Sequence, residues 1–248
     1  MKLTSTLIAF FSLAAPAVQV LAQNATGLGY GNITSSIPSN NTSLSFGRNY
    51  AVLNLDMING IYGSFNTTSQ GQQLINSTVT WINAVQAQNP PPLTIWTRIY
   101  FSNVLRPELG VGVPFQKVIG GLGNITESSP AGQIYGAFKP LQNRDVIMPK
   151  TRLYAGAGNA MEEILSSYKI DTVILSGTRA SAVILSTALR LFDLNYNVYV
   201  IADNVIETPP DNGIYKTILQ YILPKDQLNV ISLDQAIGAL NRSGPVTF

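Results

Sequence analysis

Short, nearly continuous apolar runs alternate along this chain with segments that carry apolar residues at helical spacing. The runs predict six buried strands, at residues 50–57, 93–101, 145–150, 171–177, 197–203 and 228–232. Helical spacing predicts helices at residues 71–88, 158–169, 181–194, 213–223 and 233–240, the last with Ser232 or Asp234 near its start. This alternation is typical of an α/β fold. We therefore expect a doubly wound, mostly parallel six-stranded sheet with helices on both faces, in a Rossmann-like, three-layer arrangement.

The ends of these strands are where we expect a site. In an open parallel sheet, ligands bind at the carboxyl ends of the strands, near the point where the strand order reverses. The residues that close the predicted strands are Asp56, Arg98, Lys150, Thr178 with Arg179, and Asp203.

Three segments lack this alternation. Residues 1–22 combine Lys2, an apolar stretch and small residues before Gln23, which predicts a cleaved signal peptide. Residues 23–47 are rich in Asn, Ser and Thr and predict an N-terminal arm that packs on the domain or stays mobile. Residues 48–248 form the predicted domain, in which residues 102–144 make a long irregular excursion that is either a lid or a surface loop.

Composition excludes several kinds of chemistry. The chain of 248 residues has no cysteine and no histidine, so thiolate nucleophiles, disulfides, histidine bases and nearly all zinc sites are excluded. The net charge is +2 without a basic cluster, and we therefore expect no nucleic-acid partner. We also expect no metal, no cofactor and, once the signal peptide is removed, no membrane association.

Acceptor sequons for N-glycosylation support secretion. Such a number of sequons, together with a signal peptide, predicts a secreted, extracellular glycoprotein of a eukaryotic, fungal source, and glycans would supply the solubility that few charges provide. The sequons lie at Asn24, Asn32, Asn40, Asn41, Asn66, Asn76, Asn124 and Asn241.

The order of these features resembles the isochorismatase-like (cysteine hydrolase) superfamily from about Tyr50 to Leu240. The segment "AVLNLDMINGIY" is similar to the first-strand motif of the family, and the block from "DVIMPK" through "IDTVILSGTRASAVILSTA" to "NVYVIAD" is similar to its central region. The resemblance implies that Asp56 and Lys150 stand at the catalytic positions and Val183 at the position of the nucleophilic cysteine. It also implies a cis peptide bond between Thr178 and Arg179, and matches Asp203 to a common acidic position.

The departures from the family pattern are chemically decisive at one position. Val183 has no atom that can attack a carbonyl, so the chain is not a cysteine amidohydrolase. Ile58 replaces a frequent glutamine, Gly156 and Ala157 replace bulky aromatics, and Arg179 replaces a small residue. Whether the chain is an enzyme is left open by these substitutions.

Two functional hypotheses follow. The first is an isochorismatase-type hydrolase, in which Asp56 protonates a vinyl ether, Lys150 positions and tunes it, and a small carboxylated substrate is bound. We predict substrate contacts from Arg98, Thr178, Arg179, Ser181 and Tyr154. The second is an inactive pseudoenzyme that serves as a secreted binding or host-interaction glycoprotein.

Each charged residue also has a purely structural interpretation. Asp56 could cap a turn, Lys150 could be a solvated loop charge, and Arg179 could pair with Asp56 or Asp203. By analogy with the family, a homo-oligomer is possible, and glycans at Asn66 and Asn76 could block one of its faces.

Overall fold

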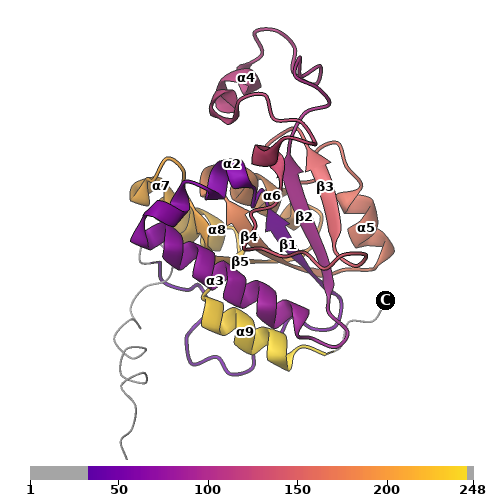
Figure 1. Ribbon diagram of the computed structural model, residues 1–248. Coiled ribbons are helices and arrows are strands. Elements are labelled where there is room, and N and C mark those ends of the chain that lie inside the picture. The colour runs from indigo at the N-terminus through magenta and orange to yellow at the C-terminus, as the bar shows by residue number, and fades with distance from the viewer. Residues whose placement is uncertain (1–32, 245–248) are drawn as a thin grey trace, which may run out of the picture.

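The computed structural model describes residues 33–244, which form one twisted sheet between two layers of helices (Figure 1). The six strands lie in the order β3-β2-β1-β4-β5-β6 and every pairing is parallel. Their bounds are β1 (Tyr50–Leu55), β2 (Leu93–Ile99), β3 (Val146–Lys150), β4 (Thr172–Thr178), β5 (Asn197–Ile206) and β6 (Asn229–Ile231). The fold class predicted from the apolar runs is confirmed.

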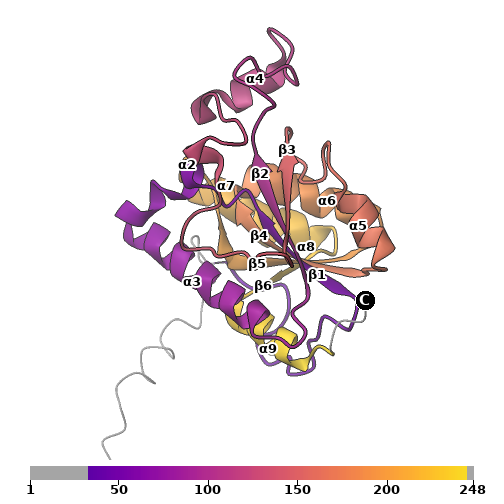
Figure 2. The same cartoon turned by 45° about the vertical axis from the view of Figure 1, so that its right-hand side comes forward.

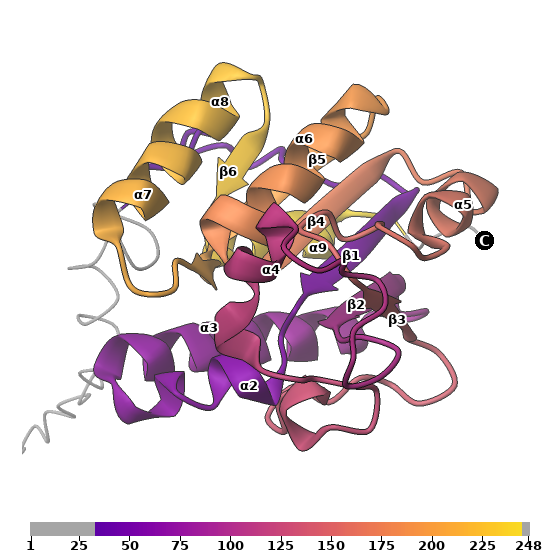
Figure 3. The same ribbon diagram turned by 90° about the horizontal axis from the view of Figure 1, so that it is seen from above.

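Helices cover both faces of the sheet, as the ribbon seen from above shows (Figure 3). On one face lie α3 (Ser69–Gln86) and α9 (Leu233–Arg242), whose Trp81 and Leu240 pack with Val52 of β1. On the other face lie α5 (Met161–Ser167), α6 (Leu185–Asp193), α7 (Asn212–Lys216) and α8 (Leu223–Lys225). Because both faces are buried, the central strands are apolar almost throughout, which is why they appear in the sequence as continuous runs.

Two of the helical segments contain a wider π turn. Residues Ala180–Ile184 lead into α6, and Thr217–Ile222 connect α7 to α8. The short helices α2 (Asn59–Tyr62) and α4 (Pro114–Val118), with single 3₁₀ turns at Phe65–Thr67, Gly120–Leu122 and Pro130–Gly132, complete the described chain. The final helix begins at Ser232, whose side chain accepts from the N–H of Gln235 in a capping box, so one of the two predicted starts is correct.

The part of the N-terminal arm that the structure describes packs on the domain. The backbone N–H of Ser36 donates to the carbonyl of Val230, and the N–H of Val230 donates to the Ser36 hydroxyl. The amide of Gln235 donates to the carbonyl of Ile37, and Phe46 fits among Tyr50, Trp81 and Tyr199. This arm therefore covers the open edge of β6, which would otherwise be free to pair with another strand. Residues 23–32 and the predicted signal peptide lie outside the described residues.

Residues 102–144 leave the carboxyl end of β2 and return to β3. Part of this excursion, around α4, projects well away from the sheet (Figure 2). Its base is packed, because Phe101, Ile119 and Ile125 form a buried cluster with Ile58. The far part exposes Leu105 and Val111 to solvent.

The strand order reverses between β1 and β4, so the carboxyl ends of these two strands flank the switch point. Gly177 allows their close approach: its φ is +142°, and a Cβ there would overlap with the carbonyl of Leu55. No residue other than glycine suits this position.

We predict that Gly177→Ala lowers the free energy of unfolding by about 2–4 kcal/mol, since the methyl group would push β4 away from β1. Urea denaturation monitored by circular dichroism would measure this loss. Gly136→Ala is the control, because a Cβ at Gly136 meets nothing within 4 Å. Equal effects of the two changes would contradict the close approach of the strands.

Candidate functional site

Asp56 and Lys150 form a buried ion pair at the carboxyl edge of the sheet. The Nζ atom of Lys150 lies 2.6 Å from Oδ2 of Asp56, and the two side chains are 1% and 6% exposed. Asp56 follows β1 with φ +56°, a left-handed conformation that aspartate tolerates better than most residues. The Thr97 hydroxyl of β2 donates to Oδ1 of Asp56 at 3.0 Å. Three neighbouring strands thus contribute one polar side chain each.

The ammonium group of Lys150 has acceptors for all three of its protons. Besides the carboxylate of Asp56, the carbonyls of Arg152 and Leu153 accept from Nζ at 2.8 and 3.2 Å. An ammonium group donates three hydrogen bonds and accepts none. The loop that follows β3 therefore wraps back onto Lys150 and uses its full hydrogen-bonding capacity.

Burial raises the pKa of Asp56 above its ordinary value, although the Lys150 charge and the hydrogen bonds from Lys150 and Thr97 act in the opposite direction. Desolvation disfavours the carboxylate and the neighbouring cation favours it, and here desolvation is the larger effect. The pair is accordingly suited to hold a proton at Asp56 at a higher pH than a solvated aspartic acid would.

A buried tyrosine lies on the β4 side of Asp56. The Thr178 hydroxyl donates to the phenolic oxygen of Tyr62 at 3.0 Å, and both residues are buried. Burial raises the pKa of Tyr62, and the negative charge of Asp56 raises it further. Tyr62 belongs to an aromatic cluster with Phe65, Tyr135 and Phe138. Tyr62 is not among the predicted site residues, because an aromatic residue on a short apolar segment has no distinguishing sequence pattern.

The turn after β4 has the geometry that the resemblance implied. The peptide bond between Thr178 and Arg179 is cis. Val183 follows within the π turn and is 1% exposed, packed in the main apolar cluster. Val183, which the resemblance matched to the family's cysteine, is therefore a core residue in this chain.

A buried glutamate occupies the start of the helix that follows this turn. The backbone N–H of Ser181 donates to Oε2 of Glu207 at 2.8 Å, and the Ser181 hydroxyl donates to Oε1 at 2.8 Å. The Nε atom of Arg179 lies 3.6 Å from Oε1, and the guanidinium also donates to the carbonyl of Thr208. A helix N-terminus with an adjacent cation favours an anion, and Glu207 is that anion. Glu207 is not among the predicted site residues, because the apolar run predicts a strand that ends at Asp203, whereas β5 continues to Ile206.

Three expectations about individual residues are corrected by these contacts. Arg179 pairs with Glu207 rather than with Asp56 or Asp203. Asp203 does not close its strand, because β5 continues to Ile206, and its carboxylate instead accepts from the N–H of Leu233 at the start of α9. Lys150 is not a solvated loop charge.

Two residues that we predicted to contact a substrate form hydrogen bonds within the chain. The guanidinium of Arg98 donates to the carbonyls of Gly132 and Glu127, so it fastens the 102–144 excursion to β2. The Tyr154 hydroxyl donates to Glu162 of α5 at 2.6 Å. Both side chains stabilise loops around the candidate site, and their polar groups are used by other parts of the chain.

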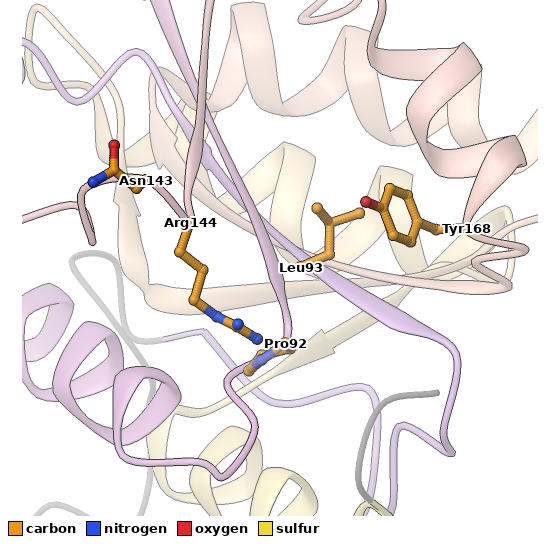
Figure 4. A pocket seen from close by; sticks show the side chains of 5 residues that line it. All are labelled: Pro92, Leu93, Asn143, Arg144 and Tyr168. Carbon is orange, nitrogen blue, oxygen red and sulfur yellow. The ribbon is translucent and has the colours of Figure 1, made fainter. Parts of the chain in front are cut away.

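Two cavities lie away from the Asp56–Lys150 pair. One, of about 220 Å³, lies at the amino end of β2 between Pro92, Leu93, Arg144 and Tyr168, at the edge of the sheet opposite the candidate site (Figure 4). Another, of about 410 Å³, lies beside β5 between Phe65, Thr68, Ile206 and the segment from Thr208 to Pro210. Ile206 and Thr208, which line the second cavity, are the sequence neighbours of Glu207. Neither cavity is lined by Asp56 or Lys150.

Within residues 33–244, no group of three or more His, Cys, Asp or Glu side chains is placed to hold a metal ion. In the same range, none of the helices has both the length and the apolar character needed to cross a bilayer.

Comparison with known proteins assigns the family. The isochorismatase domain matches residues 50–224. The chain belongs to the isochorismatase family. No curated protein matches the chain significantly.

Solved structures of the family share the fold at low sequence identity. An isochorismatase family protein from Burkholderia thailandensis is similar with a TM-score of 0.63 and 20% identity, over 80% of this chain and 98% of that one. N-carbamoylsarcosine amidase from Thermoplasma acidophilum has a TM-score of 0.58 and 18% identity, over 75% and 96% of the two chains. Nicotinamidase from Staphylococcus aureus has a TM-score of 0.55 and 16% identity, over 73% and 96%. At these identities the likeness establishes the isochorismatase-like fold.

We predict that the stability contributed by Asp56 falls as the pH rises above about 4. The unfolded chain releases the Asp56 proton near its ordinary pKa, whereas the folded chain retains it to higher pH, so deprotonation favours unfolding until the folded pKa is passed. The measurement is the free energy of unfolding in urea from pH 3 to 7, for the wild type and Asp56→Asn. The wild-type value minus the variant value should decrease with pH. A difference that increases would mean that Lys150 outweighs burial.

We predict that Glu207→Ala lowers the free energy of unfolding by about 2–4 kcal/mol, because it leaves the Ser181 N–H, the Ser181 hydroxyl and Arg179 without their carboxylate. Added sulfate should raise the melting temperature of this variant more than that of the wild type, since an external anion can take the free position. Chloride at equal ionic strength is the salt control. Glu162→Ala is the control, since it removes a partly exposed carboxylate that accepts from Arg190 and from the Tyr154 hydroxyl but does not face Arg179, and it should show no sulfate effect. The same sulfate response in all three proteins would contradict the anion position.

Proposed function

We propose that this chain is a secreted, non-catalytic member of the isochorismatase family that acts as a binding or host-interaction glycoprotein. The observation that carries the proposal is the position of Glu207. Its carboxylate accepts from the Ser181 N–H and hydroxyl and faces Arg179, which are the groups that would otherwise receive a substrate anion. A carboxylated substrate would have to displace a buried side chain to bind there.

Two features of the remaining machinery agree with this proposal. Val183 provides no nucleophile, and the chain contains neither cysteine nor histidine to replace it. Lys150 donates to Asp56 and to two backbone carbonyls, so its ammonium group has no proton left to offer a ligand. Such an ion pair can be retained for stability or for binding after catalytic activity has been lost.

The glycoprotein part of the proposal is supported by exposure. Asn24 and Asn32 lie outside the described residues, as does the predicted signal peptide. The sequon asparagines within the described residues are all exposed, which glycosylation requires, and they are Asn40, Asn41, Asn66, Asn76, Asn124 and Asn241. Glycans at Asn66 and Asn76 would stand at the start and on the outer side of α3, and would restrict any homo-oligomer to other faces.

A second candidate function rests on the raised pKa of Asp56. Acid-catalysed hydrolysis of a vinyl ether requires a carboxyl group that still carries its proton near neutral pH, and burial of Asp56 acts in that direction. In this alternative Asp56 would protonate the substrate carbon and Lys150 would orient the acid. Arg179, with a side chain 34% exposed, is then the candidate partner for a substrate carboxylate.

Incubation of the purified secreted protein with isochorismate distinguishes the two functions. Pyruvate release is followed by a coupled assay, beside Asp56→Asn as the matched variant without the acid. We expect the wild type to release no more pyruvate than Asp56→Asn. Release that depends on Asp56 would overturn the non-catalytic proposal and establish the hydrolase.

A further inference from the structure

Four buried polar atoms without a hydrogen-bond partner belong to β1, β5 and α3, which pack against one another along a seam between the sheet and the helix. Six side-chain atoms among residues 33–244 are buried without a hydrogen-bond partner. Four of them are Oδ1 of Asn54, Oγ1 of Thr78, Nε1 of Trp81 and Oδ1 of Asn204. All four residues are at most 1% exposed. An unpaired buried polar atom costs about 1–3 kcal/mol, so each of these atoms calls for a partner.

The sheet side of this seam is a row of polar residues across three central strands. Asn54 of β1 stands opposite Ser176 of β4 in the register. The amide of Asn204 in β5 approaches the Ser176 hydroxyl at 3.5 Å, the limit of a hydrogen bond. Below this row lies an apolar one, with Val52, Ile174 and Ile201 packed in the cluster that contains Trp81. The polar row therefore lies nearer to the carboxyl ends of the strands than the apolar row does, and so nearer to the candidate site.

The helix side is supplied by α3. Trp81 packs on the apolar row, and Thr78 lies one turn earlier in a helix that starts at the carboxyl edge of the sheet and ends at its amino edge. Thr78 is thus level with the polar row. The Ser77 hydroxyl donates to the carbonyl of Asp203 at 2.7 Å, which brings this turn of α3 against the residue before Asn204.

An irregularity in β5 explains why a row of this kind exists. Leu175 pairs with Val200 and Gly177 pairs with Val205, so β5 holds extra residues beside Ser176 of β4. Side-chain hydroxyls donate to two carbonyls in the extra segment. The Tyr215 hydroxyl donates to the carbonyl of Ala202, and the Ser77 hydroxyl donates to that of Asp203. Such a bulge separates the strands locally and leaves polar groups that the ladder cannot pair.

We propose that the seam bounded by Asn54, Thr78, Ser176 and Asn204 binds ordered internal water, at least one molecule of which bridges the sheet to α3. Water fits the chemistry because it both donates and accepts: Asn54, Thr78 and Asn204 present oxygens, and Trp81 presents an N–H. A metal ion does not fit, since all four side chains are neutral and the unpaired atom of Trp81 is an N–H donor. Buried waters in proteins make about three hydrogen bonds each, which this set of atoms can provide.

The location gives this water a role in positioning the candidate site. Asn54 is two residues before Asp56 on β1, and Ser176 is two before Thr178 on β4. Hydrogen bonds through water would hold the irregular part of β5 against these two strands, and Glu207 comes directly after β5. The polar row therefore fixes the three strands whose ends carry Asp56, Thr178 and Glu207.

A crystal structure of the protein at a resolution that shows water is the first test. We expect density for water within hydrogen-bond distance of at least two of the side chains of Asn54, Thr78, Trp81 and Asn204. A dry seam, closed by direct hydrogen bonds between the two asparagine amides and Thr78, would overturn the proposal.

A double-mutant cycle is the second test. Asn54→Leu and Thr78→Val remove one partner each from opposite sides of the seam while keeping the volume similar. All proteins of the cycle carry Asn76→Gln, because Thr78 completes the Asn76 sequon and Thr78→Val would otherwise also remove a glycan. We expect each to lower the melting temperature, and the double variant to lose less than the sum, with a coupling of about threefold in the unfolding equilibrium constant. Additive effects would show that no molecule bridges the two residues and would overturn the proposal.

The control pair is Asn54→Leu with Thr187→Val. Thr187 is fully buried on the other face of the sheet, where its hydroxyl accepts from the N–H of Ala155. This pair should be additive. If the control pair couples as strongly as the seam pair, the coupling reflects the whole fold and the proposal fails.

Discussion

Removing Asp56 and Lys150 from water is the constraint on which the candidate site depends. Two buried charges are costly unless they have each other and further hydrogen bonds. This chain satisfies them with Thr97 on the carboxylate and two loop carbonyls on the ammonium group. The loop after β3 must therefore wrap around Lys150, and the ends of β1, β2 and β3 are held at one point. The same saturation leaves the lysine no proton with which to bind a substrate.

The half of the site beside β4 places a negative charge at the start of a helix. The helix after β4 begins at the turn that contains Arg179, and its first N–H groups favour a negative charge. An enzyme of this fold can leave that position to a ligand, whereas here Glu207 fills it from the end of β5. Because the anion is part of the chain, the helix start is stabilised in every molecule. We infer that this position serves the fold first, which is why a non-catalytic function is the better supported proposal.

The two halves meet over an irregular sheet. Gly177 allows β4 to approach β1, while the bulge of β5 separates it locally from β4 and introduces polar residues into a face that is otherwise apolar. Parallel strands buried on both faces tolerate such polar residues only when their hydrogen bonds are completed. The proposed internal water completes them, and it would join the sheet to α3 one layer beneath Asp56 and Thr178.

The sequence by itself determined the elements and the family, because burial on both faces leaves continuous apolar runs and because the ordered motifs around Asp56, Lys150 and Val183 are local. It also determined which chemistry is impossible, since the absence of cysteine and histidine is a matter of composition. Only the tertiary structure decided the partners of the charges. Arg98 and Arg179 are predicted substrate ligands in the sequence, and the structure adds their partners within the chain, which are loop carbonyls for Arg98 and Glu207 for Arg179. Glu207 is 26 residues from Ser181, and a contact over that separation is set by how β4 and β5 pair, which no local pattern encodes.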